Sequence, residues 1–357
     1  MKHEHILIIR FSALGDVAMT VPVVYSLAHQ YPDVRITVLS KAFARPFFEN
    51  IAPNVGFMEA DVKNEYHGVK GLNALYRRLT AKKFTAIADL HNVLRSSYLR
   101  ARFNLGRYHA AHINKHRKGK RKLTSVNNKV LEQQPTSFQN YCDVFEQLGY
   151  PVTLNFQSIF PPEGGDLSVL PEVFRSIDDQ EPWIGIAPFA AHEGKIYPIK
   201  LMEQVISQLA ERYPKSKLFL FGGGKQEMSI FDDWCMRYPQ CHHASKLLGG
   251  LGEELILMSH LQVMLSMDSG NMHLASLTGT PVVSVWGATH PFGGFMGWGQ
   301  RSEDAVQIDL SCRPCSIYGN KPCMRGDYAC MHNIPPEQIV RHVATVLSRR
   351  AHQATHS

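Results

Sequence analysis

Several features that define other protein classes are missing from this sequence. It has no run of about 18–20 uninterrupted apolar residues, so no segment is expected to cross a membrane as a helix. Its first residues, MKHEHILIIRFSALGD, contain Arg10 and Asp16 and lead to no small-residue cleavage site, which predicts that no secretory signal is present. No G-x-G-x-x-G follows the first expected strand, which argues against a nicotinamide-dependent oxidoreductase. We therefore expect a cytoplasmic globular protein, in keeping with 44% hydrophobic and 19% charged residues.

Acidic residues are missing from one long segment, residues 95–122, which contains ten Lys or Arg. The net charge of +7 arises here, because the rest of the chain has 28 basic and 31 acidic residues. A concentrated positive patch attracts anionic partners, including anionic lipid surfaces. A solvated helix or loop surface is the alternative interpretation. The absence of any acid over this length favours a functional patch.

Both halves of the chain alternate short β-rich segments with helical patterns, which is typical of parallel sheets built from βαβ units. The expected strands are 5–10, 35–40, 84–90, 183–188, 217–222, 262–266 and 281–286. The expected helices are 16–31, 73–83, 136–149 and 335–350. A chain of 357 residues is long enough for two domains.

We predict an α/β protein with two domains joined by a linker. The segment 160–182 is rich in proline, glycine and acidic residues, as linkers often are. The predicted boundaries are 1–165 for the first domain, 166–182 for the linker, 183–334 for the second domain and 335–350 for a C-terminal helix. The remaining residues, 351–357, are expected to be disordered.

The most distinctive polar cluster follows the expected strand 262–266. Asp268, Ser269 and Gly270 form a turn, a helix begins near Asn271, and His273 lies in its first turn. Free N–H groups and the helix dipole make such a turn an anion site, and a glycine lets a phosphate approach the backbone. The alternative is that Asp268 or Ser269 only caps the helix and that His273 is an ordinary surface histidine. The strand–turn–helix context favours a pyrophosphate pocket.

Two further loops follow strands of the same half. Lys195, in APFAAHEGKIYP, is expected to offer a cation to a diphosphate, although an exposed lysine is usually only solvated. Glu227 follows the glycine triplet of LFGGGKQE and can accept both hydroxyls of a ribose. It is equally suited to the first turn of a helix, where carboxylates are favourable.

Asp16 is interpreted as the only acid at the corresponding turn of the first half. Two roles remain open for it. As a helix cap, its replacement would cost about 1 kcal/mol of stability. As a general base, its replacement would abolish activity and leave the fold intact.

Four of the seven cysteines are close together in the sequence, with the spacing C-x2-C-x7-C-x6-C. They are Cys312, Cys315, Cys323 and Cys330. Four thiolates can bind a structural zinc ion, and a reducing compartment disfavours disulfides. The second pair lacks the usual short spacing, so reduced, packed thiols are the alternative.

Taken together, IIRFSALGDVAMTVP, PFAAHEGKIYP, FGGGKQE and MDSGNMHLASLTGTPVVSVWG closely resemble the family nine glycosyltransferases, the heptosyltransferases of lipopolysaccharide core assembly. The resemblance covers nearly the whole chain. It implies the GT-B fold, with two Rossmann-like domains and parallel sheets facing a central cleft, and an inverting reaction that requires no metal or other cofactor.

The resemblance also implies roles for individual residues. Asp16 matches the catalytic base, Lys195 the basic residue on the donor phosphates and Glu227 the ligand of the nucleotide ribose. Asp268, Ser269, Gly270 and His273 match the site for the donor diphosphate and sugar. The basic residues expected to bind an anionic glycolipid acceptor are Arg95, Arg117, Lys118, Lys120 and Arg121.

We therefore predict an inverting transfer of heptose, from ADP-heptose, to the lipopolysaccharide inner core. The partners are a nucleotide sugar, an anionic glycolipid and, by peripheral contact, the inner face of the cytoplasmic membrane, with no role for nucleic acid. One alternative is a nucleotide-sugar epimerase or hydrolase, which would turn over the donor without an acceptor. Another is a non-catalytic nucleotide-sugar-binding protein, which would bind the donor tightly without turnover.

Overall fold

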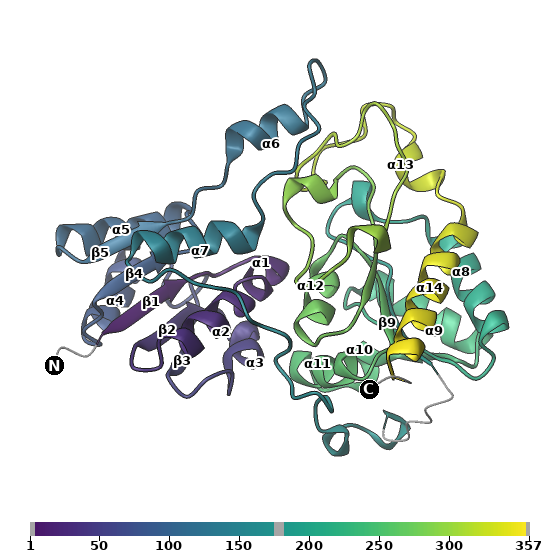
Figure 1. The fold of residues 1–357 in the computed structure, drawn as a ribbon, viewed down its shortest axis with the longest axis horizontal. Coiled ribbons are helices and arrows are strands. Elements are labelled where there is room, and N and C mark those ends of the chain that lie inside the picture. Colours follow the sequence, from purple (N-terminus) through teal and green to yellow (C-terminus); the bar gives the residue numbers. More distant parts are fainter. Residues whose placement is uncertain (1–3, 175–181, 355–357) are drawn as a thin grey trace. The chain divides into compact units, whose positions relative to one another are not determined.

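The computed structural model describes residues 4–174 and 182–354 (Figure 1). The chain groups into two compact units. The first unit consists of Met1–His116 and Pro135–Gln157, and the second of Arg117–Gln134 and Ser158–Ser357. The predicted domain limits stay a prediction, and part of the predicted linker, residues 175–181, lies outside the described residues, as do residues 355–357 of the predicted tail.

The first unit contains a five-stranded parallel sheet of order β3-β2-β1-β4-β5. Its strands are β1 (His5–Ile9), β2 (Arg35–Ser40), β3 (Val55–Glu59), β4 (Ala86–Asp89) and β5 (His109–His112). Its helices are α1 (Leu14–Ala18), α2 (Val21–Gln30), α3 (Arg45–Phe48), α4 (Gly68–Thr80), α5 (Leu94–Leu105) and α7 (Ser137–Gln147).

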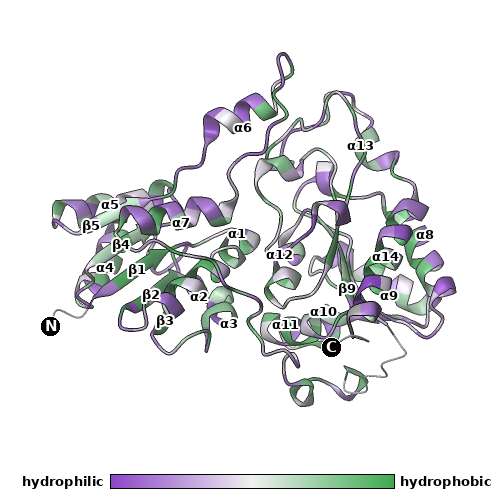
Figure 2. Cartoon of the chain, in the orientation of Figure 1, coloured by the Kyte–Doolittle hydropathy of each residue, from purple (hydrophilic) through white to green (hydrophobic). Residues whose placement is uncertain are grey.

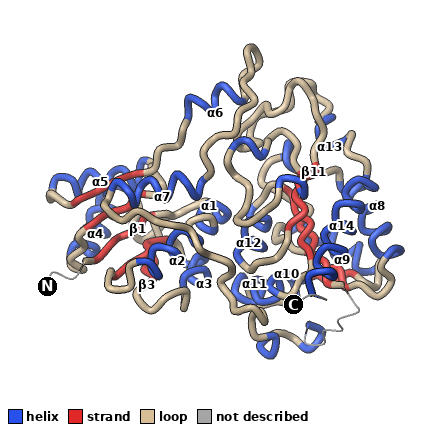
Figure 3. The backbone as a smooth tube through the Cα atoms, in the orientation of Figure 1, coloured by secondary structure: helices blue, strands red, loops and turns tan. Residues whose placement is uncertain are grey.

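The second unit contains a six-stranded parallel sheet of order β11-β10-β9-β6-β7-β8. Its strands are β6 (Trp183–Ala187), β7 (Lys217–Leu220), β8 (Cys241–His243), β9 (Val263–Met267), β10 (Val282–Val285) and β11 (Ala305–Val306). Its helices are α6 (Arg117–Leu123), α8 (Ile199–Arg212), α9 (Lys225–Arg237), α10 (Ala244–Leu247), α11 (Leu251–Ser259), α12 (Gly270–Leu277), α13 (Ala329–His332) and α14 (Pro336–Ala354). Figure 3 shows the strands of each unit collected into one sheet, with helices around it.

The central strands form because their sequences are apolar on both faces, as buried parallel strands require. All five residues of β1, HILII, and all five of β9, VMLSM, are buried. Side chains alternate along a strand, so Leu7 and Ile9 of β1 share one face. On that face they form a core with Leu72, Leu75 and Leu79 of α4. The predicted α/β class with two parallel sheets is confirmed.

The helix predicted over 16–31 is two helices in the structure. α1 ends at Ala18 and α2 begins at Val21, with Pro22 in its first turn. Proline is favoured there because its missing N–H has no intrahelical partner to lose. The break separates the short helix that carries Asp16 from the longer helix that follows it.

Residues 117–134, called here the inserted segment, pack on the second unit although both of their chain neighbours belong to the first. The Lys129 ammonium donates to the carbonyls of Cys312 and Pro314 at 2.7 and 2.9 Å. The Lys120 ammonium lies 4.1 Å from the centre of the Phe295 ring. Figure 2 shows that α6, within this segment, is mostly hydrophilic.

Among the described residues, no helix combines the length and the apolar composition needed to cross a membrane.

Candidate functional site

Each sheet has a topological switch point, where ligands of open α/β sheets bind outside the carboxyl ends of the strands. In the first unit the chain runs from β1 outwards to β2 and β3 and returns to pair β4 with the other side of β1. In the second unit β6 and β9 are related in the same way. The carboxyl ends of β1 and β4, and those of β6 and β9, are therefore where functional groups are expected.

Asp16 lies in the turn after β1, at the third residue of α1. Its Oδ2 atom accepts a hydrogen bond from the Ala13 N–H at 3.2 Å and forms an ion pair with the Arg10 guanidinium at 2.7 Å. The Asp16 side chain is 33% exposed. The carboxylate therefore caps its helix, as the simpler interpretation states, and is also accessible to a ligand at the switch point.

Arg10, which the sequence interpretation treated only as an interruption of an apolar stretch, holds this carboxylate. Arg10 is buried, and it donates through Nε to the Ser12 carbonyl at 2.9 Å and through a terminal nitrogen to the Leu90 carbonyl at 2.6 Å. These contacts join the ends of β1 and β4 and leave the other terminal nitrogen for Asp16. A buried arginine needs such partners, and this requirement is the sequence signal that could have predicted the pair.

Asp89 is a second acid at this edge of the sheet, at the end of β4 and not in the turn after β1 that carries Asp16. Asp89 ends β4, is fully buried and forms an ion pair with Arg100 at 2.6 Å. Its Oδ1 atom accepts from the N–H groups of His91 and Asn92 at 3.0 and 2.8 Å. Asp89 thus fixes the turn that carries His91 and is not accessible to a ligand.

His91 was not predicted as a site residue, yet it lies at the same switch point. Its Nε2 atom is 3.5 Å from the Ser12 hydroxyl oxygen, and the residue is 8% exposed. The pKa of His91 is lowered to about 3, mainly by burial and to a smaller extent by the nearby Arg10 and Lys115 cations. The imidazole is therefore neutral at physiological pH.

The free energy of unfolding should consequently decrease as the pH falls below 6.5. The unfolded chain binds a proton at His91 below this pH, whereas the folded chain does not until about pH 3. The contribution of His91 is complete above pH 6.5 and is lost by about 1.4 kcal/mol per pH unit below it. Urea unfolding of His91→Gln between pH 5 and 7.5 should give a shallower slope than that of the parent. The exposed His29→Gln serves as the control, and equal slopes for His91→Gln and the parent would contradict the assignment.

In the second unit, Lys195 and Asp268 meet at the switch point between β6 and β9. The Lys195 ammonium is 3.1 Å from Asp268 Oδ2, which also accepts from the Thr289 hydroxyl at 2.7 Å. The Lys195 side chain is 16% exposed and that of Asp268 is 7% exposed. The pair provides a largely desolvated cation beside the start of α12.

Arg313 supports this arrangement from behind. It is buried, and its terminal nitrogen NH2 donates to the carbonyls of Trp286 and Thr289 at 3.1 and 3.0 Å. These bonds hold the loop after β10 from which Thr289 reaches Asp268. Arg313 lies between two of the clustered cysteines, so this segment contributes to the site through an arginine that sequence reasoning did not single out.

The start of α12 agrees with the expected strand–turn–helix geometry. Ser269 occupies the N-cap position, although its side chain makes no capping hydrogen bond and lies instead 3.3 Å from the Ser266 hydroxyl. Gly270 is the first helical residue, and His273 is buried within the helix. The structure thus brings Asp268, Ser269, Gly270 and His273 together with Lys195.

Residues 72–323 match the family model described as glycosyltransferase family 9 (heptosyltransferase), which is more than half of the chain. The chain belongs to this family. A Haemophilus influenzae protein named lipopolysaccharide core heptosyltransferase OpsX is 24% identical to the family 9 chain over 296 residues, which are 80% of this chain and 79% of that protein. Asp16 lies before the matched residues of the family model.

Two solved structures share the fold of the family 9 chain. A family 9 glycosyltransferase from Veillonella parvula has a TM-score of 0.71 and 19% identity, with 98% of each chain covered. ADP-heptose lps heptosyltransferase II from E. coli has a TM-score of 0.67 and 18% identity, covering 97% of this chain and 99% of that one. The predicted GT-B fold is confirmed.

Glu227 of the family 9 chain lies at a different strand end, after β7. Its Oε2 atom accepts from the N–H groups of Gly223 and Gly224 at 2.8 and 3.2 Å, so it caps α9. In the sheet order, β6 separates β7 from β9. Glu227 and Asp268 therefore lie at strand ends about 10 Å apart.

The five candidate acceptor residues are divided between the two units. Arg95 is exposed on α5 of the first unit, whereas the other four lie on α6 in the second unit. Arg117, Lys118 and Arg121 are exposed, but Lys120 is buried against Phe295. Lys120 is therefore a packing residue, and the exposed cations of α6 remain the candidates in the inserted segment.

The structure does not support the predicted zinc site. The seven cysteines are free, and the described residues include no group of three or more His, Cys, Asp or Glu placed to hold a metal. Burial raises the pKa of Cys330 to about 11 and also raises that of Cys315.

Proposed function

We propose that this family 9 chain transfers heptose, with inversion, from ADP-heptose to an acceptor hydroxyl of the lipopolysaccharide inner core. In this proposal Asp16 is the general base and the Lys195–Asp268 region binds the donor diphosphate. The observation that carries the proposal is that ionisable, partly exposed side chains lie at the switch point of each sheet, where a ligand is expected. The names of the relatives support heptose as the sugar and ADP as the nucleotide.

The separation of the candidate donor residues fits a nucleotide diphosphate. A diphosphate at the start of α12 would receive N–H groups and the positive end of the helix dipole, with the Lys195 cation beside it. A ribose two strands away would lie near Glu227, at a distance of about 10 Å. The glycines before Glu227 leave room for this ligand, because a Cβ on Gly223 would meet no atom within 4 Å.

The proposed reaction requires one proton acceptor and one stabilised leaving group. Asp16 takes the proton of the acceptor hydroxyl, and the oxygen of that hydroxyl forms a bond to the anomeric carbon of the heptose. The bond from that carbon to the diphosphate breaks on the opposite face, and ADP leaves with the electron pair. Attack opposite the leaving group inverts the anomeric configuration. Lys195 offsets the negative charge that develops on the diphosphate, which is the role of preorganised cations in such sites, and no metal ion is required.

The acceptor in this proposal is an anionic glycolipid at the inner face of the cytoplasmic membrane. Arg95 and the exposed cations of α6 provide positive charge for its phosphate and carboxylate groups. Contacts of this kind weaken as ionic strength rises.

A donor panel tests this proposal directly. Purified protein is incubated with ADP-heptose, and separately with other ADP-, UDP- and GDP-sugars, with and without a Kdo-lipid acceptor. Transfer from ADP-heptose that depends on the acceptor, with inverted configuration in the product, is the expected result. Turnover of the donor without acceptor would instead indicate an epimerase or hydrolase, and binding without turnover would indicate a non-catalytic protein.

A further inference from the structure

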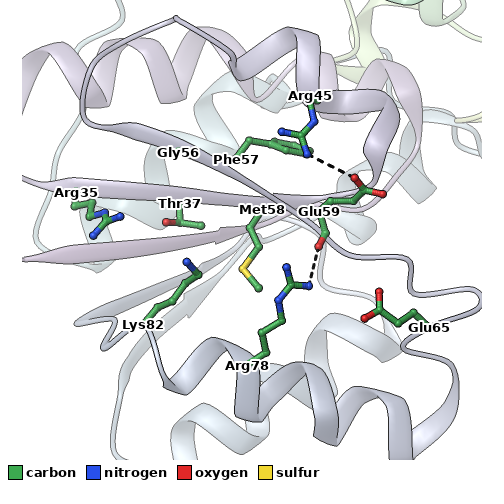
Figure 4. Close-up of a pocket in the computed structure, with 10 residues that line it drawn as sticks. All are labelled: Arg35, Thr37, Arg45, Gly56, Phe57, Met58, Glu59, Glu65, Arg78 and Lys82. Atoms are coloured by element: carbon green, nitrogen blue, oxygen red, sulfur yellow. Dashed lines mark hydrogen bonds and ion pairs between the residues drawn. The ribbon is translucent and has the colours of Figure 1, made fainter.

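The first unit contains a polar pocket along β2 and the edge strand β3 of its sheet (Figure 4). Its volume is about 460 Å³. The lining residues come from β2, β3, α3, α4 and the turns on either side of α4: Arg35, Thr37, Arg45, Gly56, Phe57, Met58, Glu59, Glu65, Arg78 and Lys82. These residues lie on or beside β2 and β3, whereas Asp16 follows β1.

The pocket exists because the face of the sheet that α4 covers changes from apolar to polar along the strands. Leu39 and Met58 occupy the carboxyl half of this face and belong to the core. On the same face, two residues earlier in each strand, Thr37 lies beside Gly56. A Cβ on Gly56 would meet only the Ile36 carbonyl, at 3.9 Å, so the missing side chain leaves an open space.

Thr37 lines the pocket and forms a buried polar pair with His5, which is not itself a lining residue. His5 is 6% exposed and Thr37 is 7% exposed. His5 Nδ1 lies 3.2 Å from the Lys82 carbonyl, and His5 Nε2 lies 2.9 Å from the Thr37 hydroxyl oxygen. Because a carbonyl can only accept, Nδ1 carries the proton, and in the neutral ring Nε2 accepts the Thr37 hydroxyl proton.

Positively charged side chains line the pocket together with Thr37. Figure 4 shows the Lys82 ammonium and the Arg78 guanidinium directed from the α4 side towards the strands, with Arg35 on β2 beside Thr37. Among the described residues, neither Arg35 nor Lys82 forms an ion pair with a carboxylate. The guanidinium of Arg78 donates to the Tyr66 hydroxyl at 2.8 Å.

The two acids of the pocket interact with groups other than Arg35 and Lys82. Glu59 is 3.6 Å from Arg45, and side chains alternate along β3, so its carboxylate lies on the other face of the sheet from Met58. Glu65 interacts with the Tyr66 hydroxyl. The space above Thr37 therefore has an excess of positive charge.

We propose that this pocket binds a phosphate group, and that binding is accompanied by protonation of His5. The phosphate oxygens would receive hydrogen bonds from Arg35, Lys82 and Arg78, and a Thr37 hydroxyl donor would complete the set. The ligand class is a small phosphorylated molecule whose phosphate enters the space left by Gly56. This site is separate from the proposed transferase chemistry and does not depend on it.

The direction of one hydrogen bond couples phosphate binding to the protonation of His5. When His5 gains a proton at Nε2, that nitrogen donates to Thr37 Oγ1 instead of accepting from it. The Thr37 hydroxyl proton is then free to point into the pocket and donate to the anion. One proton is bound for each phosphate bound in this state, and no other group changes its charge.

The charged groups around His5 favour this linkage. Burial lowers the pKa of His5, and the Arg35 and Lys82 cations lower it further, while the hydrogen bond to the Lys82 carbonyl raises it. The adjacent Glu4 interacts with the Tyr150 hydroxyl. An anion that screens Arg35 and Lys82 should therefore raise the pKa of His5, and by linkage a lower pH should strengthen binding of the anion.

Titration with sulfate and phosphate tests the proposal. Sulfate stays a dianion between pH 5.5 and 7.5, so any pH dependence of its binding belongs to the protein. The NMR signals of the His5 imidazole report on this pocket alone. We expect saturating sulfate to raise the pKa of His5, and sulfate affinity to increase at least about threefold between pH 7.5 and 5.5. Phosphate is expected to bind the same pocket in competition with sulfate.

Matched variants localise the binding. Lys82→Gln should weaken sulfate binding about tenfold, whereas Lys83→Gln, at the adjacent exposed lysine that does not line the pocket, should not. Gly56→Val should fill the space and abolish binding, and His5→Gln should remove its pH dependence. An unchanged His5 pKa at saturating sulfate, or equal affinity in the parent and Lys82→Gln, would overturn the proposal. Both measurements are made on protein without donor or acceptor, so failure here leaves the proposed transferase function untouched.

Discussion

Asp16→Asn is expected to lower kcat for heptose transfer by about 10²–10⁴-fold, the range usually supplied by a general base. The amide cannot accept the proton of the acceptor hydroxyl. It can still accept the hydrogen bond from the Ala13 N–H, so the cap of α1 is retained. The change should therefore appear in kcat measured at saturating ADP-heptose and acceptor. Loss of the carboxylate charge beside buried Arg10 should also lower the free energy of unfolding.

The control for Asp16→Asn is Asp33→Asn, which changes an exposed acid of the same unit. It should keep parental activity. Urea unfolding of both variants separates a catalytic effect from a folding effect. Full activity in Asp16→Asn would rule out Asp16 as the base, and a fall in stability with parental kcat would assign the carboxylate to the cap and the Arg10 ion pair alone.

Lys195→Met is expected to lower kcat/KM for the donor by about 10²–10³-fold. The variant removes the cation proposed to offset the charge of the diphosphate. The methionine side chain has similar length and fills most of the space of the lysine. Steady-state kinetics with varied ADP-heptose, together with the Kd for ADP, would show the loss.

Removal of this cation also leaves the buried Asp268 carboxylate with Thr289 but without its ion-pair partner. Some loss of stability is therefore expected, and Lys195→Met/Asp268→Asn should recover part of it without restoring donor binding. Lys200→Met, at an exposed lysine of α8, is the matched control. Parental kcat/KM in Lys195→Met would exclude a role for Lys195 at the diphosphate.

The central strands of both sheets could be predicted because burial on both faces leaves a clear sequence signal. The strand predicted over 35–40 is β2, and β6 and β9 lie within one residue of their predicted limits. The edge strands could not be predicted in this way. β5 has the sequence HAAH, which carries little β propensity, and its pairing with β4 holds it in place.

The candidate residues were predictable where one local pattern contains them and were missed where the partner is distant in sequence. Asp268, Ser269 and His273 lie on one strand–turn–helix unit, so the pattern contains the whole group. Arg10 and His91 come together only because β1 and β4 are neighbours in the sheet. Arg313 donates to the carbonyl of Thr289, the partner of Asp268, although it lies 24 residues after Thr289 in the chain. No periodicity in the sequence encodes these long-range contacts.

A search for polar residues at the carboxyl end of every expected strand would have found more of the site. Polar residues directly after β4 include Asp89 and His91, just as Asp268 follows β9. The sequence interpretation gave weight to the glycine-containing turns and passed over this one. Structural zinc was only one of two interpretations of the clustered cysteines, because cysteine spacing alone does not fix how thiols are arranged in space.

Assignment of the inserted segment to the second unit has a practical consequence for chimeric enzymes. The backbone passes between the two units at three places, near residues 116, 134 and 157, so a single crossover cannot exchange one unit cleanly. A hybrid joined only near residue 157 would carry the inserted segment from one parent and its contacts at Phe292, Phe295 and Cys312 from the other. Donor-side exchange between relatives should therefore transplant residues 117–134 together with the C-terminal portion.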